Sequence, residues 1–186
     1  MSPTDADLGE RLLQRARQAI EHALGLGPAP ADDPALAERG ACFVTLTRKG
    51  RLCGCMGSLK PHRALADDVV ANAQAAALRD PRFPPLSAGS WPGVSVEVSL
   101  LGRAEFLDEK DEAGVLARLR PGEDGVIFFN GCQQATFLPQ VWAQIPTPQE
   151  FLAALKQKAG LPANYWGPAV MVATYPVQKW RERAPD

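Results

Sequence analysis

The chain has 186 residues, of which 46% are hydrophobic and 22% are charged, the balance of a globular protein with its own core. The formal net charge is −1 and the basic residues are scattered, which argues against a nucleic-acid-binding or membrane-surface protein. Apolar stretches fall far short of the roughly 20 residues that span a membrane. The start of the chain is acidic and carries no apolar signal core, so we expect a cytoplasmic protein whose four cysteines stay reduced.

The first third of the sequence predicts a helix followed by a hairpin. Apolar residues at three- and four-residue steps predict a helix with a buried stripe of Leu8, Leu12, Ala16, Ala19, Ile20 and Ala23. Gly27 to Pro34 contains three prolines and predicts an extended connection. Ala41 to Thr47 alternates as a strand does, and the turn ending at Gly50 leads into a returning strand from Arg51 to Ser58.

The middle of the chain predicts a second helix, a stiff loop and a strand. The helix is marked by Leu65, Val69, Ala73, Ala76 and Ala77. It must end near Asp80, because Pro81 disfavours helical geometry in the residue before it, and the loop runs on to Pro85. Val94 to Leu100 alternates cleanly, so its valines face the core while Ser95, Glu97 and Ser99 face away.

The last third predicts further short elements. We expect strands near residues 103–106, 125–129, 134–138 and 169–177, and helical segments near 109–119, 139–144 and 148–159. The Asn130-Gly131 pair predicts a tight turn between two of these strands. Hairpins with interspersed helices, without a regular βαβ repeat, predict an α+β fold with a mainly antiparallel sheet.

The segment Cys53-Gly54-Cys55-Met56-Gly57 is the strongest candidate for chemistry. Gly54 and Gly57 carry no side chains, so a ligand or another backbone can approach Cys55 closely. An accessible thiol with amide groups around it suits a nucleophile or a ligand contact. The alternative is that Cys55 is a small packed residue beside a bulge.

A metal site and a cysteine-nucleophile site both need partners for this segment. Cys53 and Cys55 lie two apart on a predicted strand, where both sulfurs would face one ion, with His62 nearby. No second ligand pair follows, and we therefore predict neither a metal nor a cofactor. A cysteine nucleophile needs a base, and the candidates are His22, His62 and, as an alternative, Glu97. Each has an ordinary interpretation: His22 as a surface residue of the first helix, His62 as a solvated loop histidine, and Glu97 as a solvent-facing glutamate paired with Arg82 or Arg103.

The loop from Asp80 to Pro85 is the other unusual segment. Its prolines stiffen the backbone, while Asp80 and Arg82 offer polar groups. A guanidinium binds a carboxylate or phosphate through two parallel hydrogen bonds, so Arg82 is a candidate for holding an anionic ligand. The alternative is a rigid loop with a contact from Asp80 to the helix end.

Taken together, several ordered motifs of the chain resemble the AMMECR domain family, protein A of the AmmeMemoRadiSam system. The motifs are Gly50–Gly57, Asn72-Ala73, Asp80–Leu86, Val96–Leu101, Gly125–Ile127, Ala135–Trp142, Phe151-Leu152 and Lys158–Leu161. The resemblance covers nearly the whole chain and implies a single AMMECR-type domain over residues 1–186, built from a larger and a smaller lobe that form a cleft.

The resemblance also implies which residues form a site. The characteristic segment of the family reads Leu-Arg-Gly-Cys-Ile-Gly, in which Cys55 matches the cysteine while Gly54 and Gly57 match the glycines. Met56 replaces isoleucine, a mild change. Cys53 replaces arginine, which removes a fixed charge and up to five donors, and Arg51 or Arg63 is then the candidate substitute.

Two functional hypotheses follow. The first is a thiol-dependent enzyme or binding protein for a small molecule or peptide, with Cys55, Glu97 and His62 acting in the chemistry and Gly54, Gly57, Asp80, Arg82 and Arg51 in binding. The second is a non-catalytic module that docks onto a Memo-like protein or a radical SAM protein, the partners that the family name implies. The resemblance itself supplies no reaction.

Overall fold

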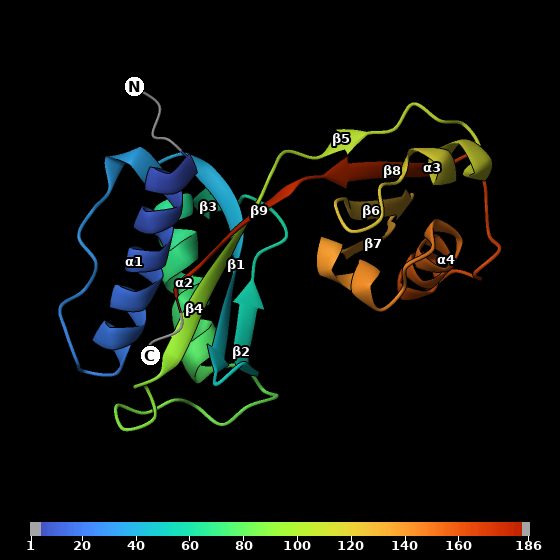
Figure 1. Cartoon of the computed structure of the whole chain (residues 1–186). Helices are drawn as coiled ribbons and strands as arrows, with labels where there is room; N and C mark the ends of the chain where they lie inside the picture. The colour runs from blue at the N-terminus through green and yellow to red at the C-terminus, as the bar shows by residue number, and fades with distance from the viewer. Residues whose placement is uncertain (1–4, 184–186) are drawn as a thin grey trace. The chain divides into compact units, whose positions relative to one another are not determined.

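The computed structural model describes residues 5–183, which form two compact units. Unit 1 runs to Leu101 and resumes at Gln178, and unit 2 runs from Gly102 to Val177. Helices and antiparallel strands occur in both units (Figure 1), which confirms the predicted α+β class. No helix within the described range is long and apolar enough to cross a membrane.

Unit 1 is a sheet covered by two helices on one face (Figure 1). Its elements are α1 (Asp5–Ala23), a short 3-10 turn (Pro34–Leu36), β1 (Arg39–Arg48), β2 (Arg51–Gly57), β3 (Arg63–Ala64), α2 (Leu65–Leu78), β4 (Val94–Leu101) and β9 (Val177–Arg181). The strand order is β2-β1-β4-β9, with β3 pairing to the start of β1. Strand β2, which carries the cysteine motif, therefore lies at an edge.

The core of unit 1 lies between the helices and one face of the sheet. The alternation predicted for β4 is confirmed, because Val94, Val96 and Val98 join this core. Helices α1 and α2 supply the opposing surface with Leu12, Ala16, Ala19, Ile20, Val69, Ala73 and Ala76. The other face of the sheet is left to the alternate residues of each strand, which are mostly polar.

A buried polar network ties α2 to β1 and to the end of β2. Asp68 accepts hydrogen bonds from the Cys42 amide at 2.9 Å, from the Ser58 hydroxyl at 2.6 Å and from Arg63 Nε at 2.9 Å. The Asn72 amide donates to the carbonyl oxygen of Cys42 at 3.1 Å and to Asp68 at 3.0 Å. Because every member has a partner, the network fixes α2 on the sheet rather than serving as an open reactive site.

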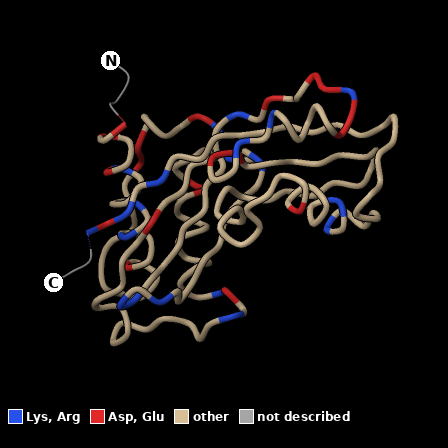
Figure 2. The backbone as a smooth tube through the Cα atoms, turned by 45° about the vertical axis from the view of Figure 1, so that its right-hand side comes forward, with Lys and Arg blue, Asp and Glu red and all other residues tan. Residues whose placement is uncertain are grey.

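Unit 2 is a second antiparallel sheet with the strand order β5-β8-β6-β7. Its elements are β5 (Glu105–Phe106), α3 (Glu112–Arg118), β6 (Gly125–Asn130), β7 (Gln133–Phe137), a 3-10 turn (Pro139–Ala143), α4 (Pro148–Lys158) and β8 (Val170–Tyr175). Trp142 stacks on Phe151 with ring centroids 3.7 Å apart inside the core of this unit. Basic and acidic residues are spread along both units, with an acidic run between β5 and α3 (Figure 2).

A close contact between α2 and β2 sets the position of the cysteine motif. Gly54 is buried and faces α2, so that a Cβ atom at this position would overlap the carbonyl oxygen of Ala76. Only a residue without a side chain lets helix and strand approach this closely. The next residue, Cys55, points to the opposite face of the sheet.

Substitution of Gly54 by alanine tests this contact. The added methyl group must push α2 away from β2, and we expect a loss of about 1–3 kcal/mol in the free energy of unfolding. Urea denaturation measures it. Gly89→Ala is the matched control, because the nearest atom to a Cβ there is the Ser87 hydroxyl at 3.9 Å. Equal stability of the two variants would contradict the interpretation.

Candidate functional site

Cys55 lies on the face of the unit 1 sheet that the helices do not cover. It pairs with Thr45 of β1, and Thr45 pairs in turn with Glu97 of β4, so the three side chains form one row across three strands. Cys55 is half-buried, and its sulfur lies 3.3 Å from the Thr45 hydroxyl. Either atom can donate in this hydrogen bond. The structure thus places a thiol, a hydroxyl and a carboxylate side by side on a polar surface.

Glu97 closes the row but does not touch the thiol. The two residues lie two strands apart, which corresponds to about 10 Å between their backbones. The Glu97 carboxylate lies 3.7 Å from Arg181 Nε, and Arg181 also donates to the Thr47 hydroxyl at 3.3 Å. The predicted pairing of Glu97 with Arg82 or Arg103 is therefore wrong. Its partner comes from β9, which returns beside β4 near the end of the chain.

Asp80 and Arg82 converge on the backbone of Cys55. The Cys55 amide donates to Asp80 Oδ2 at 2.9 Å, and Arg82 Nη2 donates to the Cys55 carbonyl oxygen at 3.2 Å. Arg82 also holds Asp80 through two hydrogen bonds, Nε to Oδ1 at 3.0 Å and Nη2 to Oδ2 at 2.8 Å. The bidentate mode predicted for Arg82 is present, and the carboxylate that it holds belongs to this chain.

The remaining predicted residues lie in different surroundings. Gly57 faces the ring of Phe43, so like Gly54 it makes room for a neighbouring side chain or backbone. His62 is exposed, with Nδ1 3.0 Å from the carbonyl oxygen of Lys60, and no described contact joins it to Cys55. Arg51 is exposed at the start of β2, opposite Arg48.

Cys53 does not share the environment of Cys55. The ladder between β1 and β2 shifts register between Leu46 and Thr47, which leaves Cys53 as the extra residue of a β-bulge. Cys53 packs against the core, and this burial raises its pKa. The expectation that both sulfurs face one ion is wrong, and among residues 5–183 no group of three or more His, Cys, Asp or Glu side chains is placed to hold a metal.

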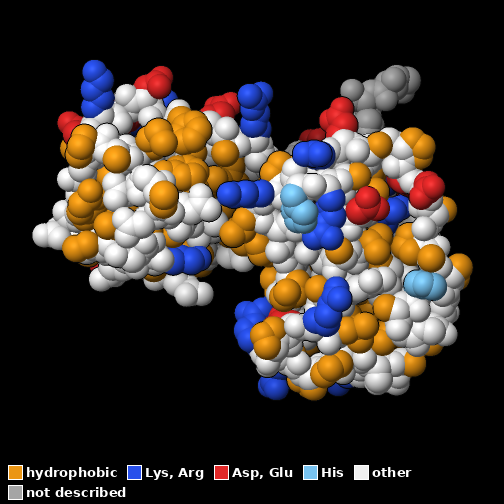
Figure 3. All heavy atoms as spheres, turned by 180° about the vertical axis from the view of Figure 1, so that it is seen from behind, with side chains coloured by type: hydrophobic (Ala, Val, Ile, Leu, Met, Phe, Trp, Pro, Cys, Tyr) orange, Lys and Arg blue, Asp and Glu red, His pale blue; other side chains and the backbone are white. Residues whose placement is uncertain are grey.

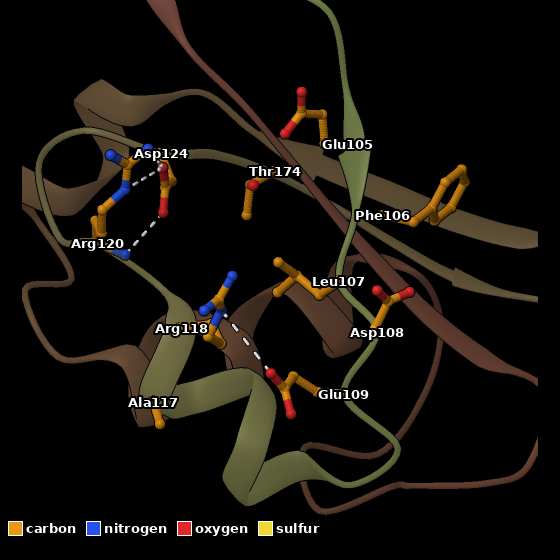
Figure 4. A pocket seen from close by; sticks show the side chains of 10 residues that line it. All are labelled: Glu105, Phe106, Leu107, Asp108, Glu109, Ala117, Arg118, Arg120, Asp124 and Thr174. Carbon is orange, nitrogen blue, oxygen red and sulfur yellow. Dashed lines mark hydrogen bonds and ion pairs between the residues drawn. The ribbon is translucent and has the colours of Figure 1, made fainter.

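Two further surface features of unit 2 were not predicted. One is a cavity of about 600 Å³ (Figure 4), lined by Glu105, Phe106, Leu107, Asp108, Glu109, Ala117, Arg118, Arg120, Asp124 and Thr174. Its guanidinium groups are engaged, Arg120 with Asp124 at 2.7 Å and Arg118 with Glu109 at 3.8 Å. The acidic run from Asp108 to Glu112 was the available signal in the sequence.

The other feature is apolar. Phe106 and Met171 are more than half exposed, and the Phe106 ring lies 5.7 Å from that of Phe129. Hydrophobic side chains gather over unit 2 in the space-filling view (Figure 3).

Comparison with known proteins defines the family. The sequence model of the AMMECR1 family matches residues 13–180. The chain belongs to the AMMECR1 family. A protein from Methanothermobacter thermautotrophicus is 35% identical over 189 residues, covering 97% of both chains, and Protein MK0488 from Methanopyrus kandleri is 33% identical over 190 residues, covering 96% of this chain and 90% of its own.

A solved structure supports the AMMECR1 assignment. The crystal structure of the uncharacterized protein PH0010 from Pyrococcus horikoshii matches with a TM-score of 0.82 at 33% identity, covering 100% of this chain and 96% of the other. The resemblance stated from the motifs is therefore confirmed as membership.

The pH dependence of stability tests the bonds to Asp80. Hydrogen bonds from Arg82, together with those from backbone amides, hold the pKa of Asp80 well below its usual value. A lowered folded-state pKa gives stability that is complete above about pH 5 and is lost as the pH falls below about 4. We expect Asp80→Asn to be less stable by about 2 kcal/mol at pH 7, and this difference to shrink towards pH 2. Urea denaturation at several pH values measures it, and a difference independent of pH would contradict the assignment.

Proposed function

We propose that Cys55 is the reactive thiol of a site on the uncovered face of the unit 1 sheet, which binds or modifies a small molecule or a peptide. The observation that carries the proposal is the half-buried Cys55, whose sulfur lies 3.3 Å from the Thr45 hydroxyl and which stands in the same row as Glu97. A ligand lying across the strands would meet a thiol, a hydroxyl and a carboxylate in that order.

The chemistry of the proposal rests on the thiolate, which is the nucleophilic form of cysteine. When Thr45 donates its hydroxyl hydrogen, it stabilises that form by a charge-assisted hydrogen bond. Glu97, held by Arg181, offers a fixed negative group to the far end of a ligand. His62 has no part in the proposal, because its described hydrogen bond goes to the carbonyl oxygen of Lys60.

The burial and pKa of two of the other cysteines favour Cys55 as the reactive thiol. Cys42 is fully buried, and burial, followed by the charge of Asp68, raises its pKa strongly. Cys53 is partly buried with a raised pKa, and Cys132 is exposed in the turn between β6 and β7. A thiol with a raised pKa is largely protonated at neutral pH and reacts slowly. The informative comparison is therefore between Cys55 and the exposed Cys132.

Alkylation kinetics test the proposal. Treatment with iodoacetamide at pH 7, followed by peptide mass spectrometry, gives a separate rate for each cysteine. We expect Cys55 to react at least about threefold faster than Cys132, because the Thr45 hydroxyl stabilises the thiolate. Thr45→Val should lower the Cys55 rate about threefold, while Thr47→Val, two residues along the same strand, should leave it unchanged. A Cys55 rate below that of Cys132 would contradict the proposal.

We also propose that this site works in an AmmeMemoRadiSam-type pathway, beside a Memo-like protein or a radical SAM protein, a role that rests on family resemblance alone. The competing hypothesis is a non-catalytic docking module in which Cys55 only packs. That hypothesis is supported if Cys55 is alkylated no faster than Cys132 and if Cys55→Ser still co-purifies with such a partner.

A further inference from the structure

The loop that follows α2 forms a clasp on one peptide unit of β2. Asp80 accepts the Cys55 amide hydrogen, Arg82 donates to the Cys55 carbonyl oxygen, and the two side chains are joined to each other. Arg82 also donates its own backbone N–H to Asp80 Oδ1 at 3.1 Å. We call Asp80 and Arg82 the Cys55 clasp. Every polar atom of the Asp80 carboxylate is used within it.

The clasp occupies the free edge of the sheet. Among the strands of residues 5–183, β2 pairs only with β1, so its backbone groups that point away from β1 have no strand from this part of the chain beside them. The bonds to Asp80 and Arg82 show that the amide and carbonyl of Cys55 are such groups. The clasp therefore gives Cys55 the two hydrogen bonds that a further strand would give, two residues from the bulge at Cys53 where the ladder is interrupted.

Burial and charge distinguish the two members of the clasp. The Asp80 side chain is 2% exposed, whereas that of Arg82 is 56% exposed. The pKa of Arg82 is raised, chiefly by its hydrogen bonds to Asp80. One negative and one positive group thus meet at the peptide groups of Cys55, and their charges cancel while both are present.

We infer that Asp80 and Arg82 are positioning residues for the Cys55 thiol, which fix its peptide groups at the free edge and keep the charge at those groups balanced. This inference rests on the proposed function, in which the Cys55 thiol is the reactive group, and adds the residues that position that thiol. The clasp holds the backbone from which the thiol projects, so the sulfur keeps one place in the row with Thr45 and Glu97. Arg82 is thereby occupied inside the chain.

Two variants that remove opposite charges test the inference. Asp80→Asn leaves the Arg82 charge unbalanced, which favours the thiolate, so the rate of Cys55 alkylation at pH 7 should rise about threefold. Arg82→Gln leaves the Asp80 charge unbalanced, so the rate should fall about threefold. If Asp80 and Arg82 only supported the fold, the two substitutions would change the rate of Cys55 alkylation in the same direction.

An equivalent ion pair in unit 2 supplies the matched control. Asp124 is buried, accepts the backbone N–H of Arg120 at 2.8 Å and holds the Arg120 guanidinium through Nε and Nη2, as Asp80 holds Arg82. Asp124→Asn should leave the Cys55 rate unchanged. Protection of Cys42 from alkylation in the same sample reports that each variant remains folded.

If Cys42 becomes reactive in Arg82→Gln, that variant is no longer folded, and Arg82→Lys is used in its place. Lysine keeps the charge and loses the bidentate geometry. The rate of Cys55 alkylation should therefore stay within about twofold of that of the original chain, while the backbone amide hydrogen of Cys55 exchanges about tenfold faster. A rate that falls as far as expected for the loss of charge would overturn the inference.

Hydrogen exchange of the Cys55 amide separates the inference from the proposed function. Its exchange should accelerate about tenfold in Asp80→Asn, whether or not the thiol is reactive. A slow Cys55 thiol in the original chain, with a protected amide, contradicts the proposed function and leaves the clasp in place. A fast thiol whose rate does not respond oppositely to the two charge variants overturns the positioning role alone.

Discussion

The contact between Gly54 and the carbonyl oxygen of Ala76 governs the geometry around the cysteine motif. It lets α2 lie directly on the edge strand β2, and it fixes where the helix ends relative to that strand. Asp80 follows the end of α2 by two residues and therefore arrives at Cys55, the neighbour of Gly54. A glycine that faces the core thus determines which carboxylate meets the backbone of a cysteine that faces away from it.

Two acidic residues organise unit 1 around this contact, and both act on backbone amides. Asp68 holds the amide of Cys42 in β1, and Asp80 holds the amide of Cys55 in β2. Each is also bonded to an arginine, Arg63 or Arg82. Because a buried carboxylate is costly without partners, these saturated arrangements make α2, β1 and β2 a rigid support. The polar face that carries the thiol is built on that support.

The sequence predicted what depends on local patterns. The alternation from Val94 to Leu100, the hairpin that returns at Arg51 and the end of α2 before Pro81 all follow from side-chain period and turn chemistry. The placement of Cys55 opposite Glu97 in one row required the register of three strands, which those patterns do not set. A bulge beside Cys55 was one of the two interpretations of the segment, but its position at Cys53 could not be predicted for the same reason, since it arises from pairing between strands.

Contacts between segments distant in the sequence could not be predicted, because they depend on how the whole chain folds back on itself. Arg181 meets Glu97 only because β9 returns to unit 1 after the whole of unit 2. The sequence made Arg82 a candidate for holding an anionic ligand, because the local pattern does not show that Arg82 binds the carboxylate of Asp80. Both side chains also bind the backbone of Cys55, which lies 27 positions before Arg82 and comes close only through the packing of α2.

The chain enters and leaves unit 2 at adjacent points. Gly102 donates its backbone N–H to the carbonyl oxygen of Pro176 at 2.8 Å, and unit 1 continues on both sides of this pair. Unit 2 is thus an insertion whose two ends already touch. Replacing it by a short turn between β4 and β9 would therefore add no entropic cost of loop closure. Such an arrangement allows the inserted segment to diverge or be exchanged over evolution while β4 and β9 stay paired.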